Sequence, residues 1–206
     1  MSGQISILCF GDSNTRGTRP DDSNTRYERS DRWTGQLQVM LGSDYYVIEE
    51  GLGGRTTDLE HPRTEKLGRN GIDYFKPCLE SHSPIDIVII MLGTNDFKNV
   101  YNRTTNEVAN VLKRYVSFTK ENYPSTRIIL VAPAPIVATE PVEFYDKESE
   151  KKSNELAASL EQLCIEEQID YFDAATVVNV GEDGIHWDLA SEKKFANSIA
   201  SIVRNT

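Results

Sequence analysis

The sequence predicts an α/β fold in which helices cover a parallel β-sheet. Short apolar runs alternate with segments of helical periodicity along the chain, which is the pattern of βαβ units. The run Ile-Val-Ile-Ile-Met-Leu at 87–92 is apolar on both faces, as expected of a central strand covered by helices on both sides. The expected strands are 5–10, 45–49, 85–92, 127–132 and 169–172.

Four segments are expected to be helical. The first covers 33–41, and the second begins at Thr104, where Thr104 and Glu107 fit a capping box. The apolar face of this second helix consists of Val108, Val111, Leu112, Tyr115 and Phe118. A third helix carries Leu156, Leu160 and Leu163, and a fourth, after Asp188, carries Phe195, Ile199 and Ile202. No repeat or low-complexity linker divides the chain, so one domain over 1–206 is expected.

Composition excludes several classes of function. The net charge of −10 disfavours nucleic-acid binding and anionic membranes, since both need clustered Lys and Arg. The apolar run 87–92 is far short of the ~20 residues of a membrane helix, and no secretory signal is evident, so we expect a cytoplasmic protein. Cys9, Cys78 and Cys164 form neither a disulfide framework nor a zinc pattern. No metal or organic cofactor is expected.

Unusual polar or glycine-rich loops follow four of the expected strands. Ser13 follows the first strand, the glycines 53–54 follow the second, and Asn95 follows the third. Asp183 and His186 lie between the fifth strand and the last helix. Because sheets of this class bind ligands beyond the carboxyl ends of their strands, we expect these residues to meet at one edge of the sheet.

These residue types together fit acyl transfer from a serine. Ser13 supplies a hydroxyl, His186 a base, and Asp183, three residues earlier, a carboxylate that orients the imidazole. The N–H groups of Ser13 and Gly54 and the side-chain amide of Asn95 supply donors for the oxyanion.

Each piece alone has a simpler interpretation. Gly-Asp-Ser-Asn is good turn chemistry, Asn95 is a possible helix cap, and His61 and His82 are expected on solvated loops. A metal-dependent phosphoesterase is an alternative, weakened because no histidine pair has ligand spacing. A non-catalytic binding module is the other alternative. The conjunction of four loops at one edge favours an enzyme.

The same loops carry a resemblance to a known family. The blocks FGDSNTRG, GLGGRTT, MLGTND and DGIHWD resemble, in order, the four blocks of the SGNH or GDSL hydrolases, and they span residues 10–188. The phrases RWTG, VIEEGL and VIIMLGTND are similar to the bacterial arylesterase and acyltransferase branch.

The resemblance implies a flavodoxin-like three-layer sandwich with a five-stranded parallel sheet in the order 2-1-3-4-5, the SGNH hydrolase fold. It implies that Ser13, Asp183 and His186 are catalytic and that Ser13, Gly54 and Asn95 form the oxyanion hole. We choose Gly54 over Gly53 because it directly precedes Arg-Thr-Thr. The implied function is hydrolysis, or acyl transfer, of small carboxylic esters. Carbohydrate deacetylation, thioester cleavage and lysophospholipid cleavage are alternatives, and oligomers occur in this branch.

Asp12, Arg16 and Trp187 flank these blocks and are candidates for contacting substrate. Arg16 stands where many relatives have an aromatic residue, which suggests a preference for polar or anionic substrates. The charged segment 16–32 either pairs with itself in solvent or borders the pocket. The segment 133–150, with Phe144 and Tyr145, fits a pocket wall or a subunit contact.

Overall fold

Five parallel strands form the centre of the molecule. The computed structural model describes residues 3–22, 25–138 and 144–205. The sheet order is β2-β1-β3-β4-β5, which confirms the predicted order. The strands are β1 (Ile5–Gly11), β2 (Tyr45–Gly51), β3 (Ile87–Met91), β4 (Arg127–Ala132) and β5 (Asp170–Asp173). Each runs within two residues of its expected range, because strands buried on both faces are nearly continuous apolar runs.

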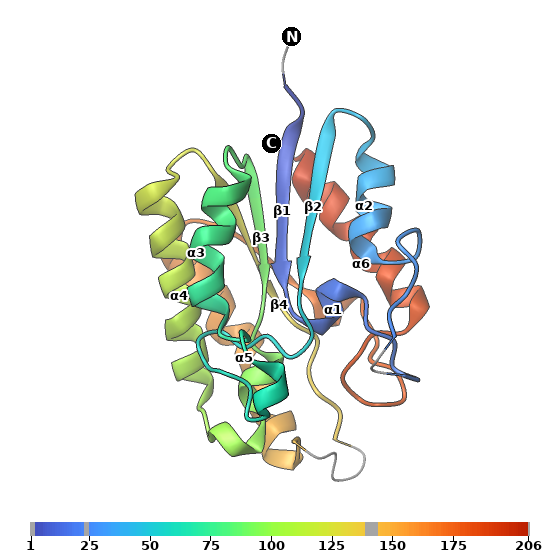
Figure 1. Ribbon diagram of the computed structural model, residues 1–206, viewed down its shortest axis with the longest axis vertical. Helices are drawn as coiled ribbons and strands as arrows, with labels where there is room; N and C mark the ends of the chain where they lie inside the picture. Colours follow the sequence, from blue (N-terminus) through green and yellow to red (C-terminus); the bar gives the residue numbers. More distant parts are fainter. Residues whose placement is uncertain (1–2, 23–24, 139–143, 206) are drawn as a thin grey trace.

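Helices cover both faces of this sheet (Figure 1). On one face lie α2 (Trp33–Leu41) and α6 (Leu189–Arg204); on the other lie α3 (Gly71–His82), α4 (Thr105–Asn122) and α5 (Lys147–Glu167). A short helix, α1 (Ser13–Arg16), follows β1, and 3-10 turns occupy Thr64–Lys66, Thr94–Phe97, Asn99–Tyr101 and Ala174–Thr176. The chain thus has the three-layer arrangement that the resemblance implies.

Two apolar layers hold the helices against the sheet. Trp33 of α2 packs edge-on against Phe195 of α6, with ring centroids 5.0 Å apart, under the face carried by Ile7 and Ile89. The opposite layer joins the other face of the sheet to α3, α4 and α5. Alternate residues of β1 and β3 therefore contribute to opposite layers, as buried parallel strands do.

Local signals explain where the long helices begin. The predicted capping box is confirmed at the start of α4, where the Thr104 side chain accepts from the Glu107 N–H and Glu107 accepts from the Thr104 N–H. Asp146 and Ser149 form a second box at α5. The helix α3, which sequence analysis did not identify, contains Pro77, a residue that usually interrupts helices.

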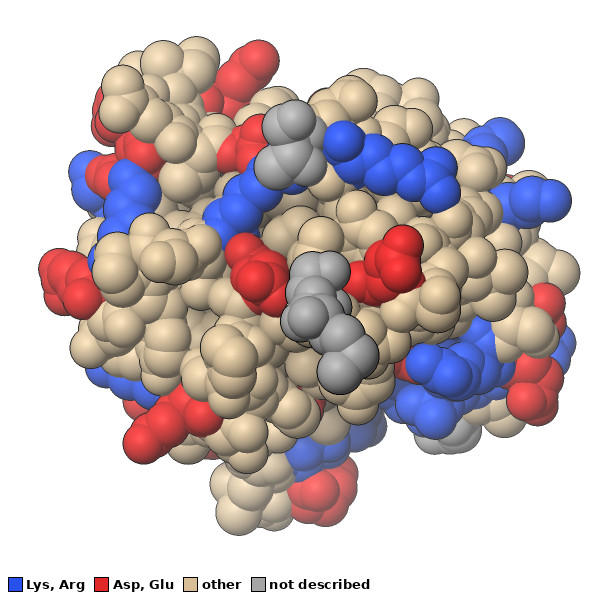
Figure 2. Space-filling model, turned by 90° about the horizontal axis from the view of Figure 1, so that it is seen from above, with Lys and Arg blue, Asp and Glu red and all other residues tan. Residues whose placement is uncertain are grey.

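The two ends of the sheet differ in character. At the amino-terminal ends of the strands, basic and acidic side chains occur near one another across the surface (Figure 2). The loops that carry the candidate site lie at the other end, with α1 (Figure 1).

In the part of the chain described here, no helix combines the length and the apolarity needed to cross a bilayer.

Candidate active site

Ser13 is the first residue of α1 and directly follows the turn that ends β1. Asp12 caps this helix: its carboxylate accepts a hydrogen bond of 3.0 Å from the Asn14 N–H. Among the described residues, the Ser13 N–H has no acceptor, so it is available to an incoming group. Gly51, at the end of β2, permits this packing, because a Cβ there would lie 2.2 Å from the backbone nitrogen of Arg16.

His186 and Asp183 form a tight pair on the loop before α6. The Asp183 Oδ2 lies 2.5 Å from the His186 Nδ1, and its Oδ1 accepts from the N–H groups of Ile185 and His186 at 2.9 and 2.8 Å. Burial would raise the pKa of Asp183, but the hydrogen bonds from His186 outweigh burial, so its pKa is lowered. Asp183 is therefore a carboxylate that holds the imidazole proton on Nδ1 and leaves Nε2 able to accept a proton.

Asn95 lies in the 3-10 turn after β3, held in one orientation. Its Oδ1 accepts from the Tyr145 hydroxyl at 3.2 Å and from the Lys98 ammonium in a short contact. Its Nδ2 donates to Asp12 Oδ2 at 3.3 Å. Since both donors hold the oxygen, the amide nitrogen faces the turn that carries Ser13. The amide can therefore serve as a donor beside the hydroxyl.

Gly54 has a φ of +81°, a left-handed conformation that favours glycine. In the described part of the chain, neither its N–H nor that of the alternative, Gly53, has a protein acceptor. The following residue, Arg55, is buried and donates to the carbonyl of Gly11 at 2.8 Å, which ties this segment to the end of β1. The segment after β2 therefore lies beside the Ser13 turn.

A cavity of about 730 Å³ brings these residues together. Ser13, Gly54, Asn95, Asp183 and His186 all line it. Among the residues that the structure describes, Ser13 and His186 share no direct hydrogen bond, but the Asn14 Nδ2 donates to the carbonyl of Ile185 at 3.3 Å. The loops of the hydroxyl and of the imidazole are thus joined.

The three expected substrate contacts lie in different places. Arg16 lines the cavity, and its guanidinium donates to Thr18 Oγ1 at 2.9 Å. Asp12 is 1% exposed and acts beneath the cavity through its hydrogen bonds to neighbouring site residues. Trp187 requires a correction: it is fully buried against Phe195, with ring centroids 4.8 Å apart, and does not line the cavity. Its aromatic ring belongs to the core layer under α6.

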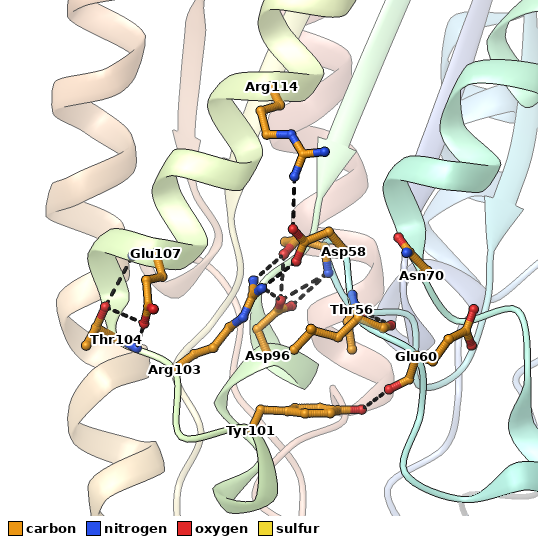
Figure 3. A network of polar contacts seen from close by, with 12 residues as sticks. Thr56, Asp58, Glu60, Asn70, Asp96, Tyr101, Arg103, Thr104, Glu107 and Arg114 are labelled. Carbon is orange, nitrogen blue, oxygen red and sulfur yellow. Dashed lines mark hydrogen bonds and ion pairs between the residues drawn. The ribbon is translucent and has the colours of Figure 1, made fainter.

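A buried polar network joins the two loops that carry the oxyanion donors (Figure 3). Asp96, next to Asn95, accepts from the Thr57 N–H at 3.0 Å and from the Thr57 hydroxyl at 2.6 Å. Arg103 contacts Asp96 at 3.5 Å and Asp58 at 2.6 Å (Figure 3). Burial raises the pKa of Asp96 to about 6, against the effect of the Thr57 hydrogen bonds. The network fixes the segment after β2 relative to the turn after β3.

Sequence analysis gave no role to Lys98, which lines the cavity. Lys98 is 4% exposed, and burial lowers its pKa to about 8. Tyr145 and Phe144 also line the cavity, so this end of the segment 133–150 is a pocket wall, whereas 139–143 lie outside the described residues. His61 is not on a solvated loop as expected: it is 6% exposed and packs edge-on against Phe144 at 5.9 Å.

One group of side chains elsewhere has the chemistry of metal ligands. Glu50, Cys78 and His82 bring donor atoms within 4.8 Å of one another, and no other such group occurs among the described residues. The three do not line the cavity. His82 is the last residue of α3 and does not lie on a solvated loop as expected. Its Nε2 lies 3.0 Å from Oε1 of Glu50 in β2. Burial and Glu50 raise the pKa of the Cys78 thiol to about 12, which opposes the thiolate form that metals bind.

The fold and the residues gathered at its carboxyl edge define an ester hydrolase of the SGNH class. The chain belongs to the GDSL-like lipase/acylhydrolase family, whose model matches residues 9–193.

Solved structures of similar chains support this assignment. The chain is 36% identical to Est24, a carbohydrate acetylesterase from Sinorhizobium meliloti, over 97% of this chain and 98% of that one, with a TM-score of 0.89. It is 35% identical to the aryl esterase of M. smegmatis over 97% and 98% of the two chains, with a TM-score of 0.88. A further relative, the uncharacterized lipoprotein YqeF of Bacillus subtilis, is 29% identical over 94 residues, which is 46% of this chain and 33% of that protein.

Proposed function

We propose that this protein is a serine esterase that cleaves small carboxylic esters through an acyl-enzyme. The observation that carries the proposal is the Asp183–His186 pair, with a contact of 2.5 Å, in the same cavity as Ser13. His186 Nε2 removes the proton of the Ser13 hydroxyl as Oγ attacks the ester carbonyl, and a tetrahedral oxyanion forms. The N–H groups of Ser13 and Gly54 and the amide of Asn95 stabilise this oxyanion.

The remaining steps complete the acyl-enzyme and then hydrolyse it, with His186 acting first as an acid and then as a base. His186 gives its proton to the leaving alcohol as the carbon–oxygen bond breaks, and the acyl group stays on Ser13. Water then attacks the acyl-enzyme, with His186 taking its proton. His186 returns this proton to Ser13 Oγ as the bond between Oγ and the acyl carbon breaks, which releases the acid and restores the free hydroxyl; an acceptor alcohol in place of water gives acyl transfer. The ester chemistry is supported by the names of the two similar structures, a carbohydrate acetylesterase and an aryl esterase. Because one of them is a carbohydrate acetylesterase, acetylated carbohydrates should be tested as substrates.

A fluorophosphonate probe tests this mechanism directly. The wild-type protein should form one stoichiometric adduct, which peptide mass spectrometry places on Ser13. His186→Ala should react far more slowly, because the hydroxyl then lacks its base, and Ser13→Ala should not react. Ser198 on α6, whose hydroxyl bonds the Lys194 carbonyl, provides a matched control as Ser198→Ala. A folded wild-type protein that forms no adduct on Ser13 would exclude the proposed nucleophile.

A further inference from the structure

The cavity has a strongly basic side, although the chain as a whole is acidic. The protein has 22 Lys and Arg against 32 Asp and Glu. Three basic side chains that line the cavity, Lys66, Arg69 and Lys98, are here called the basic wall. Two of them come from the segment between β2 and α3, and the third follows the turn that carries Asn95. Arg16 and Arg63 line the same cavity.

The basic wall is not paired directly with any described carboxylate, although the buried carboxylates of Asp96 and Asp12 attract the Lys98 ammonium from a greater distance. In the described part of the chain, none of its three members forms an ion pair. Arg69 donates instead to the carbonyls of Gly53 at 3.1 Å and Leu67 at 2.7 Å. These neutral acceptors fix the guanidinium without cancelling its charge.

The acidic residues of the cavity have partners of their own or lie on another segment. Asp183 is held by His186, and Asp21 forms an ion pair of 2.5 Å with Arg19. Asp22 also lines the cavity, on the segment after α1 rather than on the segment that carries Lys66.

His61 reports the electrostatic field in this part of the cavity. Its Nδ1 accepts from the Arg63 N–H at 3.1 Å, so the neutral ring carries its proton on Nε2. Burial, and then the charges of Lys98, Lys66, Arg63 and Arg69, lower the pKa of His61 to about 4. The ring is therefore neutral at physiological pH, and the positive charge of this region belongs to the lysines and arginines around it.

We propose that the basic wall binds an anionic group of the substrate, so that the preferred substrates are esters bearing a carboxylate. The inference rests on the proposed esterase function and adds a substrate class to it. The wall lies in the same cavity as Ser13, so a carboxylate near the scissile ester can reach it while the carbonyl reaches the hydroxyl. Partly buried cations attract an anion more strongly than cations in bulk water do.

Two matched pairs of esters test the proposal on the wild-type enzyme. In the first, 4-acetoxybenzoate and its methyl ester place the charge on the leaving group. In the second, 4-nitrophenyl hydrogen glutarate and its methyl ester place the charge on the acyl group. Each kcat/KM is divided by the imidazole-catalysed rate of the same ester, which removes differences in intrinsic reactivity. At least one pair should favour the anion by about tenfold at low salt.

Salt and substitution distinguish attraction by the wall from other causes. The preference should decline in 1 M NaCl, where the screening length is about 3 Å. Lys66→Gln should reduce the ratio of anionic to neutral kcat/KM several-fold. Lys193→Gln, the same change on the exposed face of α6, should leave the ratio unchanged.

The outcomes separate the two proposals. If the enzyme cleaves the neutral esters and forms the Ser13 adduct but has a ratio near one for both pairs, the basic wall does not select substrate and the esterase mechanism stands. If Lys66→Gln and Lys193→Gln lower the ratio equally, the effect belongs to the net charge of the protein and the wall is excluded. If no ester is cleaved and no adduct forms, the proposed function fails and this inference fails with it.

Discussion

The side-chain amide of Asn14 donates a hydrogen bond of 3.3 Å to the carbonyl oxygen of Ile185. Asn14 directly follows Ser13, and Ile185 directly precedes His186. The bond thus joins the turn of the proposed nucleophile to the loop of the proposed base, across 171 residues of sequence. Asn14 is 2% exposed, so water does not compete freely for this contact.

Asn14→Ala should lower kcat by about 10- to 100-fold, because a shift of the order of 1 Å between reacting groups costs that much. KM should change little, since the cavity walls remain. Steady-state kinetics with 4-nitrophenyl acetate measure both constants. Asn197→Ala, on the exposed side of α6, is the matched control, and a thermal melt checks folding. A folded Asn14→Ala variant with wild-type kcat would show that the bond does not position the two groups.

Asp183→Asn should reduce kcat by about 10⁴-fold, because the amide no longer fixes the imidazole proton on Nδ1. The variant keeps an oxygen that can accept from the N–H groups of Ile185 and His186, so the loop should remain folded. Glu182→Gln changes the adjacent exposed carboxylate and should retain full activity. Equal losses in the two variants would indicate a general effect of charge on the loop instead of orientation of His186.

The fold was predictable because its signals are local. The strands could be placed from buried apolar runs, and the start of α4 from the Thr104–Glu107 capping box. The helix α3 was missed because Pro77 lies inside it, and the sequence alone does not reveal that Phe75 and Leu79 would bury one face of this helix. In α3, tertiary packing stabilises a helix at a place where the proline indicated that a helix would be interrupted.

The site was only partly predictable, because its remaining residues depend on distant contacts. His61 is followed by a proline and three charged residues within five positions, which suggested a solvated loop, yet Phe144 packs on it from a segment more than 80 residues away. Lys98 is buried by its contacts with Asn95 and the Tyr145 ring, whose centroid lies 5.6 Å from Nζ. Trp187 directly follows His186 in the block DGIHWD, which suggested a contact with substrate, but its ring is buried in the core.

A chelator should leave the activity unchanged, because the proposed mechanism stabilises the oxyanion with N–H donors rather than a metal ion. The protein is incubated with excess EDTA, desalted, and assayed with 4-nitrophenyl acetate and with bis(4-nitrophenyl) phosphate. We expect wild-type ester cleavage and no phosphodiester cleavage. Loss of activity that Zn²⁺ or Mn²⁺ restores would favour the metal-dependent phosphoesterase that the sequence leaves as an alternative.

Tyr145→Phe should lower kcat with little change in KM, because it removes a donor that holds the Asn95 side chain in place. Tyr145 acts here as a positioning residue, so its effect should be smaller than that of Asn95→Ala, for which we expect a loss of about 10²- to 10³-fold. In the double variant, Tyr145→Phe should add nothing to Asn95→Ala. Full additivity in this cycle would show that Tyr145 acts on something other than the Asn95 amide.

Glu192 should make the protein less stable as the pH rises toward 8. It is fully buried in α6, where Oε2 accepts from the Trp33 N–H at 2.7 Å and Oε1 has no partner among the described residues. Burial raises its pKa to about 8. Between the ordinary glutamate value of about 4.3 and this pKa, the folded protein holds a proton that the unfolded chain has released. The free energy of unfolding therefore decreases as the pH rises through this window.

Glu192→Gln stays neutral at every pH and should lose this dependence. Thermal melts of both proteins from about pH 5 to 8.5 should show the variant gaining in Tm relative to wild type as the pH rises, with the difference levelling off above the pKa of Glu192. Asp96, with its pKa of about 6, affects both proteins alike, so the difference isolates Glu192. Glu155→Gln, on the exposed face of α5, should follow wild type throughout. A Tm difference that is constant with pH would mean that Glu192 does not gain a proton on folding.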